Sequence, residues 1–229
     1  RVRQRLRMVF DWTRAHGLRE APNPLEGVET ALPRQPRAVR HHPAMPYRDL
    51  PAFWKRLDDI KEASVLALKF LILTGVRSGE ARRARWDQID LEEAVWRAPA
   101  EIMKTHQPHR VPLSGAAIEV LRQAQDLAPR PNEALVFPGR KAGSMLSDNT
   151  LGKTLSRFGM ASDYATVHGF RSTFRDWAEE TTSYAYEVKE AALAHTVKSA
   201  TERAYRRTDH FEQRMRLMSD WAAFVTDNR

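Results

Sequence analysis

The apolar stretch at residues 65–76, interrupted by Lys69, constrains the fold more than any other part of the sequence. A membrane span needs about 18 consecutive apolar residues, so this stretch does not form one. A helix with apolar residues on nearly every face must instead be buried on all sides. The sequence therefore predicts a helix at 62–73 that is buried inside a globular domain.

The apolar helix stops at Gly75 and is followed at once by Arg77. An unpaired charge beside a core is unfavourable, so Arg77 needs an anion nearby. One interpretation pairs it with Glu80 or another carboxylate. The other makes Arg77 a phosphate clamp, because a guanidinium group offers a planar fork of donors to two phosphate oxygens.

The charge balance indicates a polyanionic partner. The 229 residues include 37 Lys and Arg against 29 Asp and Glu, a formal net charge of +8, which makes nucleic acid the first candidate. The sequence has no cysteine, which excludes disulfides, thiolate zinc sites and cysteine nucleophiles. We expect a cytoplasmic protein with no membrane partner.

Two segments precede the main domain, which begins near Pro46. Residues 1–20 keep helical spacing up to a stop at Gly17, and five prolines between positions 22 and 43 predict an extended linker. A lone amphipathic helix normally packs on a neighbour, so we expect the first segment to be the end of a truncated upstream domain. Nine arginines against four acids in residues 1–45 are suited to lying along phosphates. The linker residues expected to bind DNA are Arg34, Arg37 and Arg40.

The main domain is predicted to be mainly α-helical with a small antiparallel β-sheet, an α+β fold. Lys104 lies at the end of a predicted strand, beside the turn at 105–108, where a long side chain reaches either solvent or a bound partner. The predicted strands are residues 95–96, 102–103 and 110–112. The predicted helices are residues 47–60, 62–73, 113–127, 148–158, 170–181, 187–194, 199–206 and 211–227.

His168, Arg171 and Arg175 form a basic cluster on one face of the predicted helix at 170–181. Spacings of three and four residues place side chains next to one another on a helix. These cations repel one another unless an anion binds between them. Structural pairing with Asp176 or Glu179 is the alternative.

His195 and Tyr205 lie near the C-terminal end of the domain. His195 ends a predicted helix on its apolar side, which by itself indicates a core histidine. Tyr205 follows a capping box and is accompanied by arginines, Arg203 among them. Tyrosine in a helix is usually a packing residue, but cations near a phenol favour its ionised form, and a phenolate is a competent nucleophile.

Taken in order, these residues resemble the active-site series of the tyrosine recombinases, the phage integrase family. The matching segments are LTGVRSGE at 73–80, VHGFR at 167–171 and LAHT at 193–196, with Tyr205 ten residues after His195. The resemblance runs from about Pro46 to the C-terminus. Within the family, the chain is most similar to prophage and genomic-island integrases of the satellite-phage type.

The resemblance implies a tyrosine-recombinase catalytic domain that uses neither a metal nor another cofactor. Tyr205 would attack a DNA phosphate and leave a 3′-phosphotyrosine. Arg77 and Arg171 would hold the non-bridging oxygens and neutralise charge as the phosphorus becomes pentacoordinate.

The resemblance also implies roles for the remaining polar residues. Lys104 would protonate the departing 5′ oxygen, His168 would assist proton transfer with Tyr205, and His195 would donate to the phosphate. Glu80 would support the site by orienting its groups. Arg175 and Arg203 are expected to contact DNA.

The same resemblance implies a domain order and a set of partners. Residues 1–28 would end a truncated core-binding domain, 29–45 would be the linker, and 46–229 the catalytic domain. The implied partners are double-stranded DNA attachment sites, further copies in a tetramer on DNA, a host DNA-bending protein and an excisionase. The C-terminal helix at 211–227 packs either on its own core or on a neighbouring protomer.

The implied activity is site-specific integration or excision of a mobile element carried by a bacterium or prophage. Three alternatives are a chromosome-dimer resolvase, a type IB topoisomerase-like enzyme and a non-catalytic, basic helical DNA-binding protein. The first two share the covalent chemistry, whereas the third predicts DNA binding without covalent capture. The non-catalytic alternative leaves the ordered recurrence of all the motifs unexplained.

Overall fold

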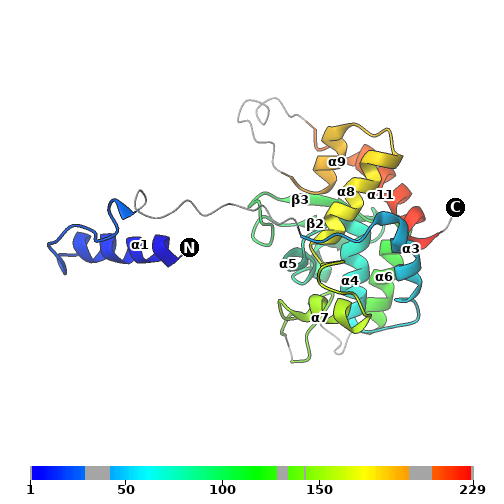
Figure 1. Cartoon of the computed structure of the whole chain (residues 1–229). Helices are drawn as coiled ribbons and strands as arrows, with labels where there is room; N and C mark the ends of the chain where they lie inside the picture. Colours follow the sequence, from blue (N-terminus) through cyan, green and yellow to red (C-terminus); the bar gives the residue numbers. More distant parts are fainter. Residues whose placement is uncertain (1, 29–41, 128–133, 142, 196–207, 228–229) are drawn as a thin grey trace. The chain divides into compact units, whose positions relative to one another are not determined.

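The structure is a computed structural model that describes residues 2–28, 42–127, 134–141, 143–195 and 208–227 (Figure 1). The chain forms two compact units, Arg1–His41 and His42–Arg229. Within the described parts of the chain, every helix is too short or too polar to cross a lipid bilayer.

Helix α1 (Val2–Ala15) makes up most of the described part of the first unit. The chain leaves this helix through Gly17, which has a φ of 68° and confirms the predicted stop. Val2, Val9 and Trp12 expose more than half of their surface. Helices with such an exposed apolar face commonly pack against another surface.

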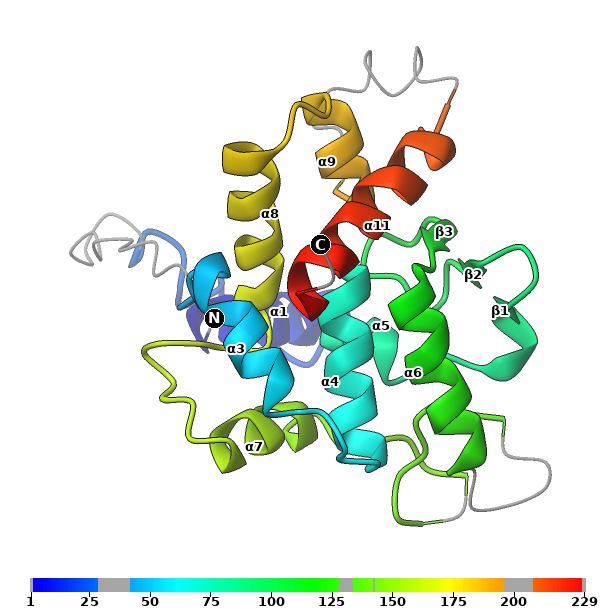
Figure 2. The same ribbon diagram turned by 90° about the vertical axis from the view of Figure 1, so that its right-hand side faces the viewer.

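The described part of the second unit is rich in helices and contains one small antiparallel sheet, which confirms the predicted fold class (Figures 1 and 2). Its helices are η1 (Tyr47–Asp49), α3 (Leu50–Lys55), α4 (Ala63–Thr74), α5 (Ser78–Ala81), η2 (Trp86–Gln88), α6 (Gly115–Asp126), α7 (Thr150–Arg157), α8 (Gly169–Thr181), α9 (Tyr186–Ala192) and α11 (Phe211–Thr226). Its strands are β1 (Ile89–Asp90), β2 (Val95–Ala98) and β3 (His109–Pro112).

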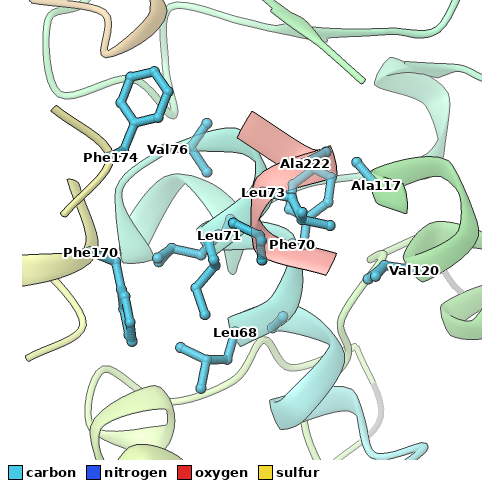
Figure 3. Close-up of a cluster of buried hydrophobic side chains, with 14 of the residues drawn as sticks. Leu68, Phe70, Leu71, Leu73, Val76, Ala117, Val120, Phe170, Phe174 and Ala222 are labelled. Atoms are coloured by element: carbon cyan, nitrogen blue, oxygen red, sulfur yellow. The ribbon is translucent and has the colours of Figure 1, made fainter. Parts of the chain in front are cut away.

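Helix α4 lies in the middle of this unit, as its apolar sequence predicts (Figure 2). Its residues 65–74 are all buried, and α6, α7, α8 and α11 pack around it. Figure 3 shows part of this core, with Phe70 and Leu71 between Phe170 of α8 and Val120 of α6. Burying each large apolar side chain contributes about 1.5–3 kcal/mol. The helix ends where Gly75 adopts the left-handed conformation.

Lys69 is the exception in this apolar helix, and its side chain is also buried. Its ammonium group lies 3.1 Å from the Asp58 carboxylate and 4.8 Å from the centre of the Trp54 ring. An anion and an aromatic face together offset the loss of water around the charge.

The sheet has the order β1-β2-β3, and both pairs are antiparallel. The register of β2 and β3 pairs Val95 with Pro112 and Ala98 with His109. Residues 99–108 therefore form the connection between these two strands.

The predicted strand at 102–103 is wrong, because these residues form turns within the β2–β3 connection. The backbone N–H of Ile102 donates to the Pro99 carbonyl at 3.3 Å, and that of Met103 donates to the Ala100 carbonyl at 3.2 Å. Both groups are thus used locally rather than in a ladder. The third strand is β1, which the short apolar pattern did not reveal.

The helix predicted at 47–60 is also shorter than expected. It begins as η1, continues as α3 and ends at Lys55. Asp59 has a φ of 64°, which an α-helix does not accommodate.

The N-terminus of α8 is held against the first residues of the second unit. The Thr166 backbone N–H and hydroxyl both donate to the Pro43 carbonyl at 3.0 Å, and the Thr173 hydroxyl donates to the Met45 carbonyl at 2.7 Å. Gly169 packs so closely here that a Cβ would overlap the Pro43 carbonyl oxygen and lie 2.9 Å from the Ala44 Cα.

This contact predicts that Gly169→Ala destabilises the protein by about 1–3 kcal/mol, the usual effect of overpacking. Gly152→Ala is the matched control, because Gly152 is helical and a Cβ there has nothing within 4 Å. The control should be neutral or stabilising by up to about 1 kcal/mol. Urea unfolding of both variants measures the difference, and equal stabilities would contradict the close approach.

Helix α11 packs on its own core, which is one of the two arrangements left open by the sequence. Its buried residues include Leu217, Met218, Trp221 and Val225. The Trp221 indole N–H donates to the Ile72 carbonyl of α4 at 2.8 Å. This bond and the surrounding apolar contacts attach the last helix to the central one.

Candidate active site

Arg77 lies just after α4, at the N-cap position of the short helix α5. Its guanidinium Nη1 is 3.0 Å from Glu80 Oε1, and its backbone N–H donates to Glu80 Oε2 at 2.8 Å. The pairing of Arg77 with Glu80 considered from the sequence is therefore present. Only one guanidinium nitrogen of Arg77 makes this contact, so the pairing does not use all of the N–H donors of the group.

Glu80 also holds the loop that carries Lys104. Its side chain is 3% exposed, and its Oε1 accepts the Lys104 backbone N–H at 3.2 Å. One buried carboxylate thus fixes two segments that lie 24 residues apart in the chain. Lys104 is itself exposed, as predicted, although it lies in the connection between β2 and β3 rather than at the end of a strand.

Arg171 is buried in the first turn of α8 and joins the ends of two other helices. Its Nη1 donates to the Gly75 carbonyl after α4, and its Nη2 donates to the Leu193 carbonyl after α9 at 2.6 Å. Burial and the nearby positive charge of Arg77 lower the Arg171 pKa to about 10. The guanidinium group remains charged at neutral pH.

His168 lies immediately before α8, and its ring meets that of His42 edge-on, with 4.7 Å between ring centres. Partial burial lowers the His168 pKa, and the charges of His42, Arg171, Arg77 and Lys104 lower it further. A neutral imidazole can accept a proton as well as donate one.

His195 follows α9 and is partly buried. Its Nδ1 lies 2.9 Å from Glu190 Oε2. Burial lowers the His195 pKa, Glu190 opposes this effect, and the charges of Arg171 and Arg77 add to it.

Hydrogen bonds show that distant parts of the sequence have converged. Glu80 contacts both Arg77 and the Lys104 backbone, and Arg171 contacts the carbonyls two residues before Arg77 and His195. The charge of Arg77 lowers the pKa of His168, Arg171 and His195, and the charge of Lys104 lowers that of His168. The result is a basic cluster in which Glu80 pairs with Arg77 and Glu190 pairs with His195. Such a cluster favours a bound anion, and its fixed donors can stabilise charge that develops on a phosphate.

Several predicted residues lie outside the described parts of the chain. These are Tyr205 and Arg203, together with the linker residues Arg34, Arg37 and Arg40. Arg175 is described, and its Nε is 3.6 Å from Glu190 Oε1. Of the two carboxylates considered for this face, Glu179 pairs with Lys189 at 3.5 Å.

A second polar cluster, which the sequence analysis missed, joins α11 to β3. Arg214 is fully buried and donates to Asp209 Oδ2 at 2.8 Å and to the Arg110 carbonyl at 2.6 Å. Arg110 in turn makes two bonds to Asp209, at 2.7 and 2.9 Å. Burial and then the charge of Arg214 lower the pKa of neighbouring His109 to about 4. The charge of Glu80 raises this pKa, and that of Arg171 lowers it. The cluster therefore borders the basic site.

Comparison with known proteins gives consistent results. The profile of the phage integrase family matches residues 46–211. Prophage integrase IntZ of Escherichia coli strain K12 is 38% identical over 202 residues, which are 87% of this chain and 48% of the relative. The integrase of Enterobacteria phage P4 is 32% identical over 224 residues, 90% of this chain and 50% of the relative. The chain thus spans about half the length of these relatives.

Solved structures show the same fold at low sequence identity. The integrase from mycobacterium phage Brujita has a TM-score of 0.59 at 19% identity, covering 99% of this chain and 71% of its own. A lambda integrase tetramer bound to a Holliday junction has a TM-score of 0.60 at 18% identity, covering 87% of this chain and 58% of its own.

Proposed function

The chain belongs to the phage integrase family, and from this we propose that it is a tyrosine recombinase that cuts and rejoins DNA. The observation that supports the proposal is the convergence of Arg77 and Arg171 with Lys104, His168 and His195, through the hydrogen bonds of Glu80 and Arg171 and the start of α8. Together these residues provide two guanidinium groups and three proton donors or acceptors for one phosphodiester.

In the proposed reaction, the Tyr205 hydroxyl oxygen attacks the phosphorus. The bond from phosphorus to the 5′ oxygen breaks, and a 3′-phosphotyrosine forms. His168 takes the phenolic proton, and Lys104 gives a proton to the departing 5′ oxygen. Attack by another 5′-hydroxyl reverses these steps, so the bond energy is retained and no ATP is consumed.

We assign the remaining residues to stabilisation of the phosphate and its surroundings. Arg77 and Arg171 face the non-bridging oxygens, where charge increases in the transition state. His195 donates to a phosphate oxygen. Glu80 keeps Arg77 and the Lys104 backbone in place through the bonds described above.

We also propose a domain order and a set of partners. Residues 46–229 would form the catalytic domain, 1–28 the end of a core-binding domain and 29–45 a linker whose arginines, with Arg175 and Arg203, contact DNA. The working form would be a tetramer on attachment-site DNA, assisted by a host DNA-bending protein and an excisionase. We propose that it is encoded by a bacterium or a prophage and acts in the cytoplasm.

Covalent capture tests the proposal. The 229-residue protein is incubated with a library of nicked suicide duplexes that carry randomised core sequences, and linked complexes are isolated on a denaturing gel. We expect a protein–DNA adduct with a sequence preference in the captured DNA, and peptide mapping should find the DNA on the peptide that contains Tyr205.

The other outcomes identify the alternative functions. Duplexes that bind without any covalent capture would indicate a non-catalytic DNA-binding protein. Capture without sequence preference, together with relaxation of supercoiled plasmid, would indicate a topoisomerase-like enzyme. Either result contradicts the proposed site-specific recombinase.

A further inference from the structure

Glu190 contacts His195 through both its backbone and its side chain. The His195 backbone N–H donates to the Glu190 carbonyl at 3.0 Å, and His195 Nδ1 lies 2.9 Å from Glu190 Oε2. The chain returns to Glu190 because Ala194, with a φ of 48°, turns it back at the end of α9. This double contact leaves the imidazole little freedom to rotate.

The side-chain contact determines where the proton of a neutral His195 resides. An ionised carboxylate only accepts hydrogen bonds, so Nδ1 must carry the hydrogen. The other ring nitrogen, Nε2, then has a free lone pair when the ring is neutral and a second N–H when it is protonated. The hydrogen bond at one nitrogen thus sets the chemistry available at the other.

Glu190 is itself held by its surroundings. Its side chain is 19% exposed, and Oε1 lies 3.6 Å from Arg175 Nε without making a hydrogen bond. Its negative charge also acts on buried Arg171. The carboxylate therefore lies between His195 and Arg175 of α8.

From this geometry we infer that Glu190 is a positioning residue: it holds His195 in the Nδ1–H form when the ring is neutral, and it supports the protonated ring, whose Nε2–H then faces the reacting phosphate. The part concerning the phosphate rests on the proposed function. The position of the proton on His195 depends only on the protein and can be tested without DNA.

The charges around His195 give the direction of its titration. Burial and the positive charges of Arg171 and Arg77 lower its pKa, whereas Glu190 raises it. Removing the Glu190 carboxylate should therefore lower the His195 pKa further. A smaller fraction of His195 would then be protonated at any given pH.

Nitrogen-15 NMR of the histidine rings measures the tautomer and the pKa directly. The sequence contains eight histidines, and the His195 signals are those lost in His195→Gln. Above its pKa, wild-type His195 should carry its proton on Nδ1. Glu190→Gln should keep this tautomer, because the amide oxygen accepts the same bond, whereas Glu190→Ala should shift the proton toward Nε2.

Two matched variants separate positioning from general packing. Glu179→Gln removes a carboxylate that joins α8 to α9 through Lys189 and should leave the His195 tautomer and pKa unchanged. Arg175→Ala removes the other partner of Glu190 and should preserve the Nδ1–H form. A neutral wild-type His195 with its proton on Nε2, or a Glu190→Ala spectrum identical to wild type, would overturn the inference.

The rate of adduct formation on a captured suicide duplex tests the link to catalysis. Glu190→Ala should react on the order of tenfold more slowly than wild type, because the imidazole loses the partner that fixes its orientation toward the phosphate. Glu190→Gln should react at close to the wild-type rate at low pH, where His195 is protonated and the amide oxygen still accepts its Nδ1–H. Equal rates in all variants, despite a changed tautomer, would refute the positioning role. Absence of any wild-type adduct would instead count against the proposed function.

Discussion

Replacing Tyr205 with phenylalanine is expected to abolish covalent capture of DNA while leaving DNA binding within about twofold of wild type. The substitution removes one oxygen atom, which is the proposed nucleophile, and keeps the aromatic ring. Covalent catalysis has no route without that atom. The measurement is the yield of adduct on a denaturing gel, with binding followed by fluorescence anisotropy on the same duplex.

The other tyrosines provide controls for this experiment. The hydroxyls of Tyr47 and Tyr184 donate to Glu180 and Asp220, at 2.8 and 2.7 Å. Burial and the bond to Asp220 raise the Tyr184 pKa to about 12, which makes this phenol a poor nucleophile. Tyr184→Phe should therefore form the adduct at the wild-type rate.

Tyr186 is the more demanding control, because it is 55% exposed at the start of α9. Tyr186→Phe should also retain full capture. An adduct that persists in Tyr205→Phe but disappears in Tyr186→Phe would move the nucleophile to α9 and contradict the assignment.

The sequence predicted the elements of the site whose local pattern is strong. An apolar run followed by Gly75 correctly indicated a buried helix that ends beside Arg77. The helical spacing of His168, Arg171 and Arg175 correctly placed Arg171 at the start of α8. In both cases the controlling interactions are those between near neighbours in the chain.

Contacts between distant segments were not predictable in the same way. The hydrogen bond from the Lys104 backbone to Glu80 depends on how the β2–β3 connection folds. The sequence analysis predicted a strand at 102–103, within this connection, and so did not predict its turns. Glu190 was missed because a residue five positions before His195 does not share its helical face. The left-handed Ala194 brings the two together, and no local pattern indicated that conformation.

Arg77→Ala is expected to slow adduct formation about a hundredfold, the scale of losing one donor that stabilises transition-state charge. Single-turnover rates at saturating protein measure this effect, and anisotropy should show retained DNA binding. Arg171→Ala should be at least as slow. It is harder to interpret, because Arg171 also donates to the carbonyls of Gly75 and Leu193.

The structure provides a control for the Arg77 variant. Removing Arg77 leaves the buried Glu80 carboxylate without its ion-pair partner, and an uncompensated buried charge can disturb a site by itself. The double variant Arg77→Ala with Glu80→Gln removes this charge. If Arg77 acts on the phosphate, the double variant stays about as slow as Arg77→Ala. If Arg77 serves only to neutralise Glu80, the double variant recovers the wild-type rate, and that recovery would refute the phosphate-binding role because no guanidinium group would then be needed at this position.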